Sequence, residues 1–270
     1  VGCLTSISLA SNNAKVCLIE KSSFNMISAD TYSPLSLTLN TKLFLKSQNL
    51  WDEDYMKSNN IKKLTIKVWN SFNKLQITNK DINNDFLGSI VDKISFLNYL
   101  RNACSKNKNI TIIDNAEPKL KVSNKYHAVI LDGKDFGSKK IFVTDGVNSE
   151  SAKALKIRSK AIKYNQTSYI MNCSGSCYSN EAYQIFTEYG VFAILPVKSN
   201  EACIVATIKD KYKSEFNLDS DNPELSLLKK QLTPFVNDFK SFKVIFSHPL
   251  NTSRLDDWIK DNVVFLGNSS

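Results

Sequence analysis

The sequence has few arginines, although it is basic overall. Of its 35 basic residues only Arg101, Arg158 and Arg254 are arginine, and the rest are lysine. Recognition of phosphates and bases favours the planar arginine side chain, so the net charge of +9 is weak evidence for a nucleic-acid partner. Asparagine occurs 29 times, and both lysine and asparagine have A-rich codons. An AT-rich genome explains this composition, and we expect no nucleic-acid partner.

Long apolar runs and an N-terminal leader pattern are also absent from the sequence. No run of about 18 apolar residues occurs, which argues against a membrane-spanning helix. The first residues lack a basic stretch followed by an apolar one, as a signal peptide would have. We therefore expect a cytoplasmic protein, with peripheral contact to the inner membrane as an option. Since the apolar fraction is 42%, we also expect a packed core.

Histidine and closely spaced cysteine are scarce, which limits the chemistry that the side chains offer. His127 and His248 are the two histidines, so we do not expect a Ser-His-Asp triad. Six cysteines are present, and the closest pair is Cys173 and Cys177. Their spacing differs from the two-residue gap of common zinc and redox motifs, and no His stands nearby. The sequence predicts no metal site and a reducing compartment.

Hydrophobic periodicity predicts an alternation of helices and strands in the first half and mostly strands in the second. Helical spacing occurs at 4–11, 37–45, 94–104 and 223–239. Strand patterns occur at 15–20, 63–69, 110–113, 126–131, 140–144, 168–172, 183–187, 192–195, 202–208, 242–246 and 262–266. This order favours an α/β nucleotide-binding half interleaved with a mostly β half.

The first 20 residues match the second part of a dinucleotide-binding βαβ unit. Gly2 begins a helix of small residues, and a strand then ends at Glu20, 18 positions later. In such units a glycine permits close packing of helix and strand, and the acid binds a ribose hydroxyl. The first strand and first two glycines of the motif are absent, and a βαβ unit without a cofactor would give the same pattern.

Three further segments extend the resemblance to one protein family over nearly the whole chain. They are Asp145–Ser149 (DGVNS), Ala182–Pro196 (AYQIFT, then GVFAILP) and Val263–Asn268 (VVFLGN). In this order, with Gly2 and Glu20, they resemble the ubiquinone-biosynthesis hydroxylases. These are FAD-dependent aromatic monooxygenases with a fold like that of p-hydroxybenzoate hydroxylase. Connecting segments of that family are also similar to Leu87–Asp92, Tyr164–Gln166 and His248–Leu250.

The resemblance implies an α/β fold in which an FAD-binding, Rossmann-like domain is interleaved with a mostly antiparallel β-sheet substrate domain. The FAD-binding segments would be 1–62, 87–159 and 259–270. The substrate-domain segments would be 63–86 and 160–258.

The resemblance also implies cofactor-binding roles for six residues. Gly2 would pack the first helix beside the FAD pyrophosphate, and Glu20 would hold the adenosine ribose. Asp145-Gly146 would line the pyrophosphate and the route of NAD(P)H, and Gly267-Asn268 would hold the ribityl chain. The resemblance identifies no catalytic residue.

The sequence departs from the family at several of these positions. Ser33 stands nearest the position of a family arginine, Val143-Thr144 replaces Gly-Ala, and Asn268 replaces an aspartate. The family also has a strand before the segment that starts at Val1, and a His-Pro and glycine-rich turn after the one that ends at Ser270. On this interpretation the 270 residues are a fragment truncated at both ends, and activity of the fragment alone is in doubt.

The implied reaction is hydroxylation of an aromatic ring, with electrons from NAD(P)H and oxygen from O2. The implied substrate is a polyprenylphenol intermediate of ubiquinone biosynthesis, and other proteins of that pathway are candidate partners. One alternative is a non-catalytic or degenerate fragment of the same fold that does not bind FAD. A related FAD enzyme acting on another aromatic, a halogenase or epoxidase, and a basic nucleic-acid-binding module also stay open.

Overall fold

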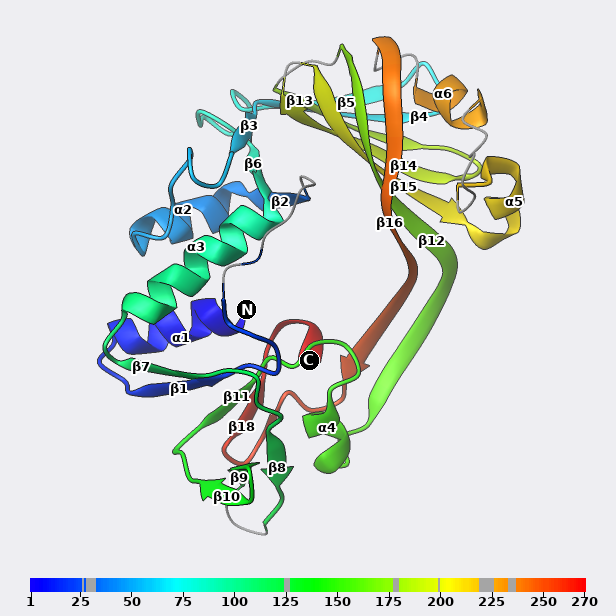
Figure 1. Ribbon diagram of the computed structural model, residues 1–270. Helices are drawn as coiled ribbons and strands as arrows, with labels where there is room; N and C mark the ends of the chain where they lie inside the picture. The colour runs from blue at the N-terminus through cyan, green and yellow to red at the C-terminus, as the bar shows by residue number, and fades with distance from the viewer. Residues whose placement is uncertain are drawn as a thin grey trace. The chain divides into compact units, whose positions relative to one another are not determined.

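The computed structural model describes residues 1–25, 27, 33–123, 127–176, 180–198, 200–218, 226–232 and 237–270 (Figure 1). The chain divides into two compact units, and each is described by itself. Unit 1 comprises Val1–Ser28, Leu97–Ile162 and Asn251–Ser270. Unit 2 comprises Ala29–Phe96 and Lys163–Leu250.

Unit 1 contains two pairs of parallel strands. β1 (Val16–Ile19) pairs with β7 (Ile110–Ile113), and β11 (Ile141–Val143) pairs with β18 (Val263–Phe265). The two pairs belong to separate sheets. All four strands are short and rich in Val and Ile, as is usual for parallel strands that are covered by other elements. In each pair the polar residues after the strands come together at one edge.

Helices and smaller strands complete unit 1. They are α1 (Gly2–Ser11), the unit 1 part of α3 (Lys93–Lys106), β8 (Lys119–Lys121), β9 (Ala128–Leu131), β10 (Lys134–Phe136), α4 (Glu150–Ala154), β17 (Ile259–Lys260) and the 3-10 helix η2 (Gly267–Ser269). β9 and β10 form the hairpin predicted at Asp132-Gly133, where both residues have positive φ (48° and 76°). The buried core includes Val143, Leu155, Val263 and Phe265.

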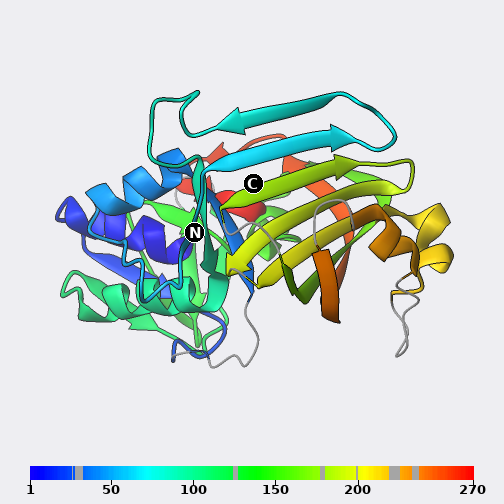
Figure 2. The same cartoon turned by 90° about the horizontal axis from the view of Figure 1, so that it is seen from above.

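Unit 2 is built on a seven-stranded sheet with the order β16-β12-β15-β14-β13-β4-β5, and its strands lie side by side in Figure 2. Its strands are β4 (Lys63–Val68), β5 (Lys74–Thr78), β12 (Ser159–Ser176), β13 (Glu181–Phe186), β14 (Gly190–Lys198), β15 (Glu201–Lys209) and β16 (Asn237–Leu255). β13 and β4 are parallel, whereas β12, β15, β14 and β13 pair antiparallel in succession. The sheet is therefore mostly antiparallel, as the sequence predicts.

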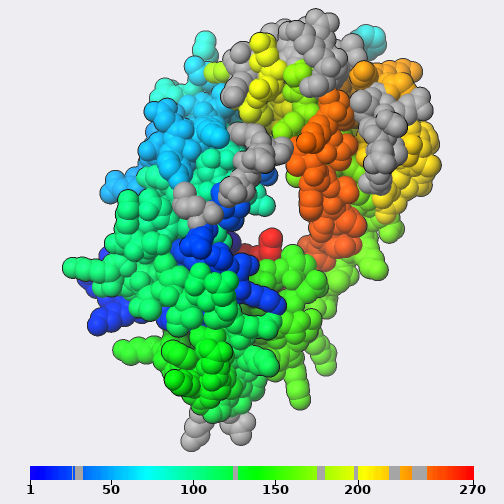
Figure 3. Space-filling view, viewed as in Figure 1, coloured from blue at the N-terminus to red at the C-terminus, as the bar shows by residue number. Residues whose placement is uncertain are grey.

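One face of this sheet is covered by short helices. α5 (Lys213–Phe216), which follows the 3-10 helix η1 (Asp210–Tyr212), and α6 (Ser226–Leu232) pack there. Phe216 and Leu228 are fully buried against alternate residues of the strands, which are Tyr169, Met171, Ile185, Phe192, Ile194 and Ile204 among others. The edge strand β16 instead reaches the surface, where it is orange in Figure 3.

A smaller antiparallel sheet, with the order β2-β6-β3, completes unit 2. It consists of β2 (Pro34–Thr38), β3 (Asn59–Ile61) and β6 (Gly88–Asp92), and α2 (Leu39–Ser47) follows β2. The helix predicted from residue 37 begins at Leu39 instead, because the hydroxyl of Thr38 accepts a hydrogen bond from the Thr41 N–H (3.3 Å) and caps it.

The helix predicted over 223–239 is wrong at its C-terminal end. α6 covers Ser226–Leu232, and residues 237–239 belong to β16. Helical spacing of apolar residues predicts one continuous helix through Leu225, Leu228, Leu232 and Phe235. The segment that follows instead forms a strand that pairs with β12. Residues 223–225 and 233–236 lie outside the described part of the chain. No helix in the described part is long and apolar enough to cross a membrane.

The division into contact-defined units does not decide where a cofactor domain would end and a substrate domain begin. The boundaries at 62, 86, 159 and 258 stay a prediction.

Candidate functional site

The two predicted motifs Asp145-Gly146 and Gly267-Asn268 lie at the same edge of one strand pair. β11 and β18 are parallel, with Val143 opposite Phe265. The N–H of Leu266 continues this pairing by donating to the Val143 carbonyl (3.0 Å). Since both motifs directly follow these strands, the topology brings them together at the carboxyl end of the pair. Ligands of open α/β sheets bind at this end of the strands.

Gly267 packs directly against the first residue of the chain. Its φ is +67°, and a Cβ placed on it would lie 2.7 Å from Cγ2 of Val1. The buried hydroxyl of Ser269 stabilises this turn, because it donates to the carbonyls of Val143 (2.8 Å) and Leu266 (2.7 Å). Val1 is the N-cap residue of α1, so the Gly267 turn borders the N-terminus of that helix.

Gly2 brings the same helix end close to both strand pairs. A Cβ at Gly2 would lie 3.0 Å from Oγ1 of Thr144, just after β11, and 3.7 Å from Cδ1 of Leu18 in β1. A larger side chain would push α1 away from both neighbours. Gly2 is thus closely packed, and its predicted place beside the FAD pyrophosphate stays a prediction.

The N-terminus of α1 is suited to an anion. The first turn of a helix leaves N–H groups without partners inside the helix, and the helix dipole makes this end positive. No side chain caps α1, and its first turn contains no acidic residue. This end of the helix can therefore receive a phosphate group.

Glu20 lies at the corresponding end of β1. Its N–H donates to the carbonyl of Ile113 (2.9 Å), which extends the pairing of β1 with β7 by one residue. Its half-buried carboxylate accepts a hydrogen bond from the Ser22 N–H (3.1 Å). Its charge raises the pKa of the Cys3 thiol in α1, although other influences lower that pKa overall. A carboxylate at this place can accept hydrogen bonds from sugar hydroxyls.

Asp145 is exposed and also organises the loop that follows it. Its Oδ2 accepts hydrogen bonds from the Ser149 hydroxyl (2.8 Å) and the Ser151 N–H (3.4 Å). Ser149 in turn caps α4 through the Ala152 N–H (3.1 Å). Gly146 has a φ of +83°, which a residue with a side chain rarely adopts. The pair thus makes a turn whose backbone is open to a ligand.

The site contains two contact residues that the motif comparison did not identify as functional. Thr144 touches Gly2, and Ser269 holds the Gly267 turn through its two hydrogen bonds. In the sequence, only their position directly beside the predicted motifs marks these two residues. Thr144 stands where the family has a small residue, and Ser269 directly follows Asn268. Asn268 itself is exposed at this turn.

The buried histidine of unit 1 has a structural role. Nε2 of His127 lies 3.0 Å from Oδ2 of Asp261, and Nδ1 accepts a hydrogen bond from the Ser123 N–H (3.2 Å). Asn262 joins the His127 backbone through both its amide atoms (3.0 Å each). No group of three or more His, Cys, Asp or Glu side chains suited to a metal ion occurs among the described residues.

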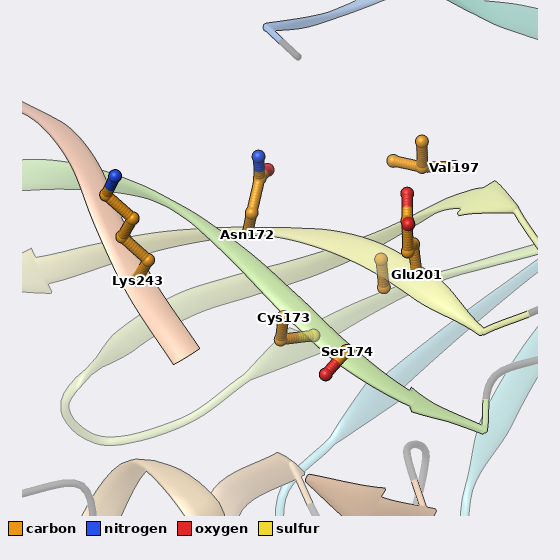
Figure 4. Close-up of a pocket in the computed structure, with 7 residues that line it drawn as sticks. Asn172, Cys173, Ser174, Val197, Glu201 and Lys243 are labelled. Atoms are coloured by element: carbon orange, nitrogen blue, oxygen red, sulfur yellow. The ribbon is translucent and has the colours of Figure 1, made fainter. Parts of the chain in front are cut away.

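Unit 2 contains a cavity of about 270 Å³ on its large sheet (Figure 4). Its lining residues are Asn172, Cys173, Ser174, Val197, Glu201, Ala202 and Lys243. In Figure 4 the Asn172 amide, the Glu201 carboxylate and the Lys243 amine project to the same side of the sheet. The cavity thus combines an apolar wall with groups that can recognise a polar or anionic substituent.

No protein-family model matches the sequence, and no curated protein matches it either. Solved structures of aromatic oxygenases nevertheless share the fold across almost the whole chain. This confirms the predicted fold class, an α/β protein with a large, mostly antiparallel sheet.

Three solved structures, two of them oxygenases by name, illustrate the likeness. The tetrameric form of 2-methyl-3-hydroxypyridine-5-carboxylic acid oxygenase is 17% identical, with a TM-score of 0.74 over 100% of this chain and 72% of its own. The p-nitrophenol 4-monooxygenase PnpA from Pseudomonas putida DLL-E4 is 13% identical, with a TM-score of 0.73 over 99% and 70%. CtdE, solved with FAD and a substrate, is 12% identical, with a TM-score of 0.72 over 100% and 72%.

Proposed function

We propose that unit 1 binds FAD at the N-terminus of α1 and that the protein is a monooxygenase which hydroxylates an aromatic ring. One observation carries the proposal. Gly2, Thr144 and Gly267 converge on the first turn of α1, and the Asp145-Gly146 and Asn268 positions are adjacent to them. The fold shared with two oxygenases and with CtdE, which was solved with FAD, supports the choice of cofactor.

The residues present fit the parts of FAD one by one. The pyrophosphate would lie against the N–H groups of α1, a helix end with no side-chain cap and no acidic residue in its first turn. Glu20 would accept hydrogen bonds from the adenosine ribose. Asp145 would orient the backbone of Gly146 at the same edge, and the neutral Asn268 amide would face the ribityl hydroxyls.

Bound FAD would supply the chemistry that transfers electrons from NAD(P)H to O2 and one oxygen atom to the ring. This chain's own residues would hold the cofactor, orient the ring and exclude water. We assign no catalytic acid or nucleophile of the hydroxylation to this chain. Specificity would therefore come from the shape and polarity of the substrate cavity.

We propose a polyprenylphenol of ubiquinone biosynthesis as the substrate, on the basis of the two hairpin segments Ala182–Thr187 and Gly190–Pro196. These segments form β13 and β14, with Tyr183 opposite Ile194, and most of their apolar side chains are in the core. The named oxygenases act on single-ring compounds. The cavity of about 270 Å³ in unit 2 has the size of such a ring, and a prenyl tail would extend beyond it.

The lysine-rich composition favours peripheral contact of such an enzyme with anionic lipid. Other proteins of the same pathway are proposed as partners on the same basis. Flotation with anionic vesicles, but not with neutral ones, is the expected result for the lipid contact. Equal binding to both kinds of vesicle would contradict it.

The cofactor proposal is tested by adding FAD to the purified chain and measuring absorbance and the dissociation constant. We expect a flavin absorbance band that stays with the protein through gel filtration. The variant Gly2→Val should weaken binding by more than tenfold, because its side chain pushes α1 away from Thr144 and Leu18. Gly137→Val is the matched control, since a Cβ at Gly137 meets no atom within 4 Å.

The alternative is a non-catalytic chain with the same fold, which the neutral Asn268 and Ser33 would suit. A folded protein with no flavin band after FAD is added would establish that alternative and overturn the cofactor proposal. Equal loss of binding in both glycine variants would show that the site lies elsewhere.

A further inference from the structure

Two free cysteines from distant parts of the sequence meet in unit 1. Cys3 lies in the first turn of α1, and Cys104 lies near the C-terminus of α3. The two helices are neighbours in Figure 1. The Cys104 thiol donates a hydrogen bond to the Cys3 carbonyl (3.7 Å), and the two side chains are near enough to shift each other's pKa.

The two thiols differ in access and in acidity. Cys3 is partly exposed, whereas Cys104 is fully buried. The hydrogen bond with Cys104 is the largest influence on Cys3 and lowers its pKa to about 7, despite burial, which raises it. The same hydrogen bond and burial raise the pKa of Cys104. The pair is therefore a partly exposed thiol with a lowered pKa beside a buried thiol with a raised one, and the thiolate is the reactive form of cysteine.

Charged groups on neighbouring elements also shift the pKa of Cys3. Arg101 of α3 lowers the pKa of Cys3, and the Glu20 carboxylate after β1 raises it. Two other described cysteines, Cys17 and Cys203, differ from Cys3 in the direction of the pKa shift. Burial raises the pKa of Cys17, and burial together with the charge of Cys173 raises that of Cys203 to about 12.

We propose that Cys3 and Cys104 form a peroxide-reactive dithiol pair that closes to a disulfide between α1 and α3. The Cys3 thiolate attacks one oxygen of hydrogen peroxide, so that an S–O bond forms, the O–O bond breaks and hydroxide leaves. The Cys104 sulfur then attacks the Cys3 sulfur, so that the S–S bond forms and the S–O bond breaks. Water leaves with the Cys104 proton. Two thiols lose two electrons, and peroxide becomes two waters.

Closure would tie the first turn of α1 to α3. The same turn carries Gly2 and borders the Gly267 turn, so oxidation would restrict the part of unit 1 that we assign to phosphate binding. The inference rests on the two thiols alone and holds whether or not the chain binds FAD.

Peptide mapping of the whole chain tests the proposal directly. The reduced protein is treated with one equivalent of hydrogen peroxide at pH 7.5, blocked with N-ethylmaleimide and digested with trypsin without reduction. The expected product joins the peptide 1–15, which contains Cys3, to the peptide 102–106, which contains Cys104. Recovery of both peptides with blocked, unlinked cysteines would overturn the proposal, and so would linkage of Cys3 mainly to another cysteine.

Variants separate the roles of the two thiols. In Cys104→Ser the Cys3 sulfenic acid should persist and react with dimedone, whereas Cys17→Ser should form the linked peptide as the unaltered chain does. Closure of the unaltered chain should be about tenfold slower at pH 6 than at pH 8, as follows from a thiolate with a pKa of about 7. A rate that does not change with pH would contradict Cys3 as the attacking thiol. If Cys104→Ser does not fold, peptide mapping of the unaltered chain still tests whether Cys3 and Cys104 form a disulfide.

Discussion

Gly267 lies so close to Val1 that a single methyl group on it would come within 2.7 Å of the valine side chain. The contact joins the turn after β18 to the start of α1, and neither residue belongs to the hydrophobic core cluster of β11 and β18. The contact therefore joins the side chain of Val1 to the backbone of a glycine.

The variant Gly267→Ala should destabilise unit 1 by about 1–3 kcal/mol. The new methyl group clashes with Val1, and alanine at a φ of +67° adds strain. Urea unfolding followed by circular dichroism gives the change in the free energy of unfolding. Gly137→Ala should stay within about 0.5 kcal/mol of the unaltered chain, because its site is open. Similar losses in both variants would mean that the Val1 contact has no special weight.

Lys42 is a buried cation whose removal should cost stability in unit 2. Its Nζ donates to Oδ1 of Asn60 (2.7 Å) and Oγ of Ser89 (3.1 Å), and it pairs with Glu53 (2.9 Å). The ammonium also lies 4.3 Å from the ring centre of Phe86. We expect Lys42→Met to lower the free energy of unfolding by about 1–3 kcal/mol, since these polar partners lose a charged donor.

Lys46 gives the matched control for this prediction. It lies one turn further along α2 and pairs with the same glutamate at 3.7 Å, but its side chain is 47% exposed. Lys46→Met should change stability by no more than about 0.5 kcal/mol, because exposed ion pairs contribute little. If the two variants behave alike, burial of Lys42 is not the source of its contribution.

Glu53 should make stability fall in acid. The hydrogen bond from Lys42 holds the pKa of Glu53 below its usual 4.5, against the raising effect of burial. A carboxyl group with a lowered folded-state pKa stabilises the fold above its unfolded pKa, and this stability is lost as pH falls through the folded value. In Glu53→Gln the urea midpoint should fall less steeply below pH 4.5 than in the unaltered chain. Glu150→Gln, at an exposed site, should leave the acid slope unchanged.

Asn268→Asp should strengthen FAD binding, a prediction that rests on the proposed function. A carboxylate accepts hydrogen bonds from ribityl hydroxyls more strongly than a neutral amide, so we expect a dissociation constant about fivefold lower. Asn13→Asp adds the same charge at the other end of α1 and should not change the constant. Weaker binding by the Asn268 variant would place the cofactor's phosphates, rather than its ribityl chain, beside this residue.

Local patterns in the sequence predict the strands and turns of the candidate site well. The β runs that end at Glu20, Asp145 and Gly267 are all found, because short apolar strands followed by acids or glycines leave a clear pattern. The contacts of Gly2 with Thr144 and of Gly267 with Val1 are not readable from the sequence. They join residues far apart in the chain and depend on backbone distances that no spacing encodes.

Two further features show where local patterns fail. The helical spacing over 223–239 competes with pairing in the sheet, and pairing determines the structure from Asn237 onward. Lysine side chains are usually exposed, so the sequence gives no sign that Lys42 is buried. Its burial depends on Trp51 and Phe86, which supply ring faces for the ammonium, and on the oxygen atoms that accept its protons.

The position of Gly2 between Thr144 and Leu18 has a thermodynamic consequence. The two parallel strand pairs of unit 1 belong to separate sheets, and the first turn of α1 touches both of them. A ligand that binds this turn would thus bind both pairs in their assembled state only. The ligand concentration would then set the melting temperature of unit 1. The stability of the unit and the occupancy of the site would be governed by the same binding equilibrium.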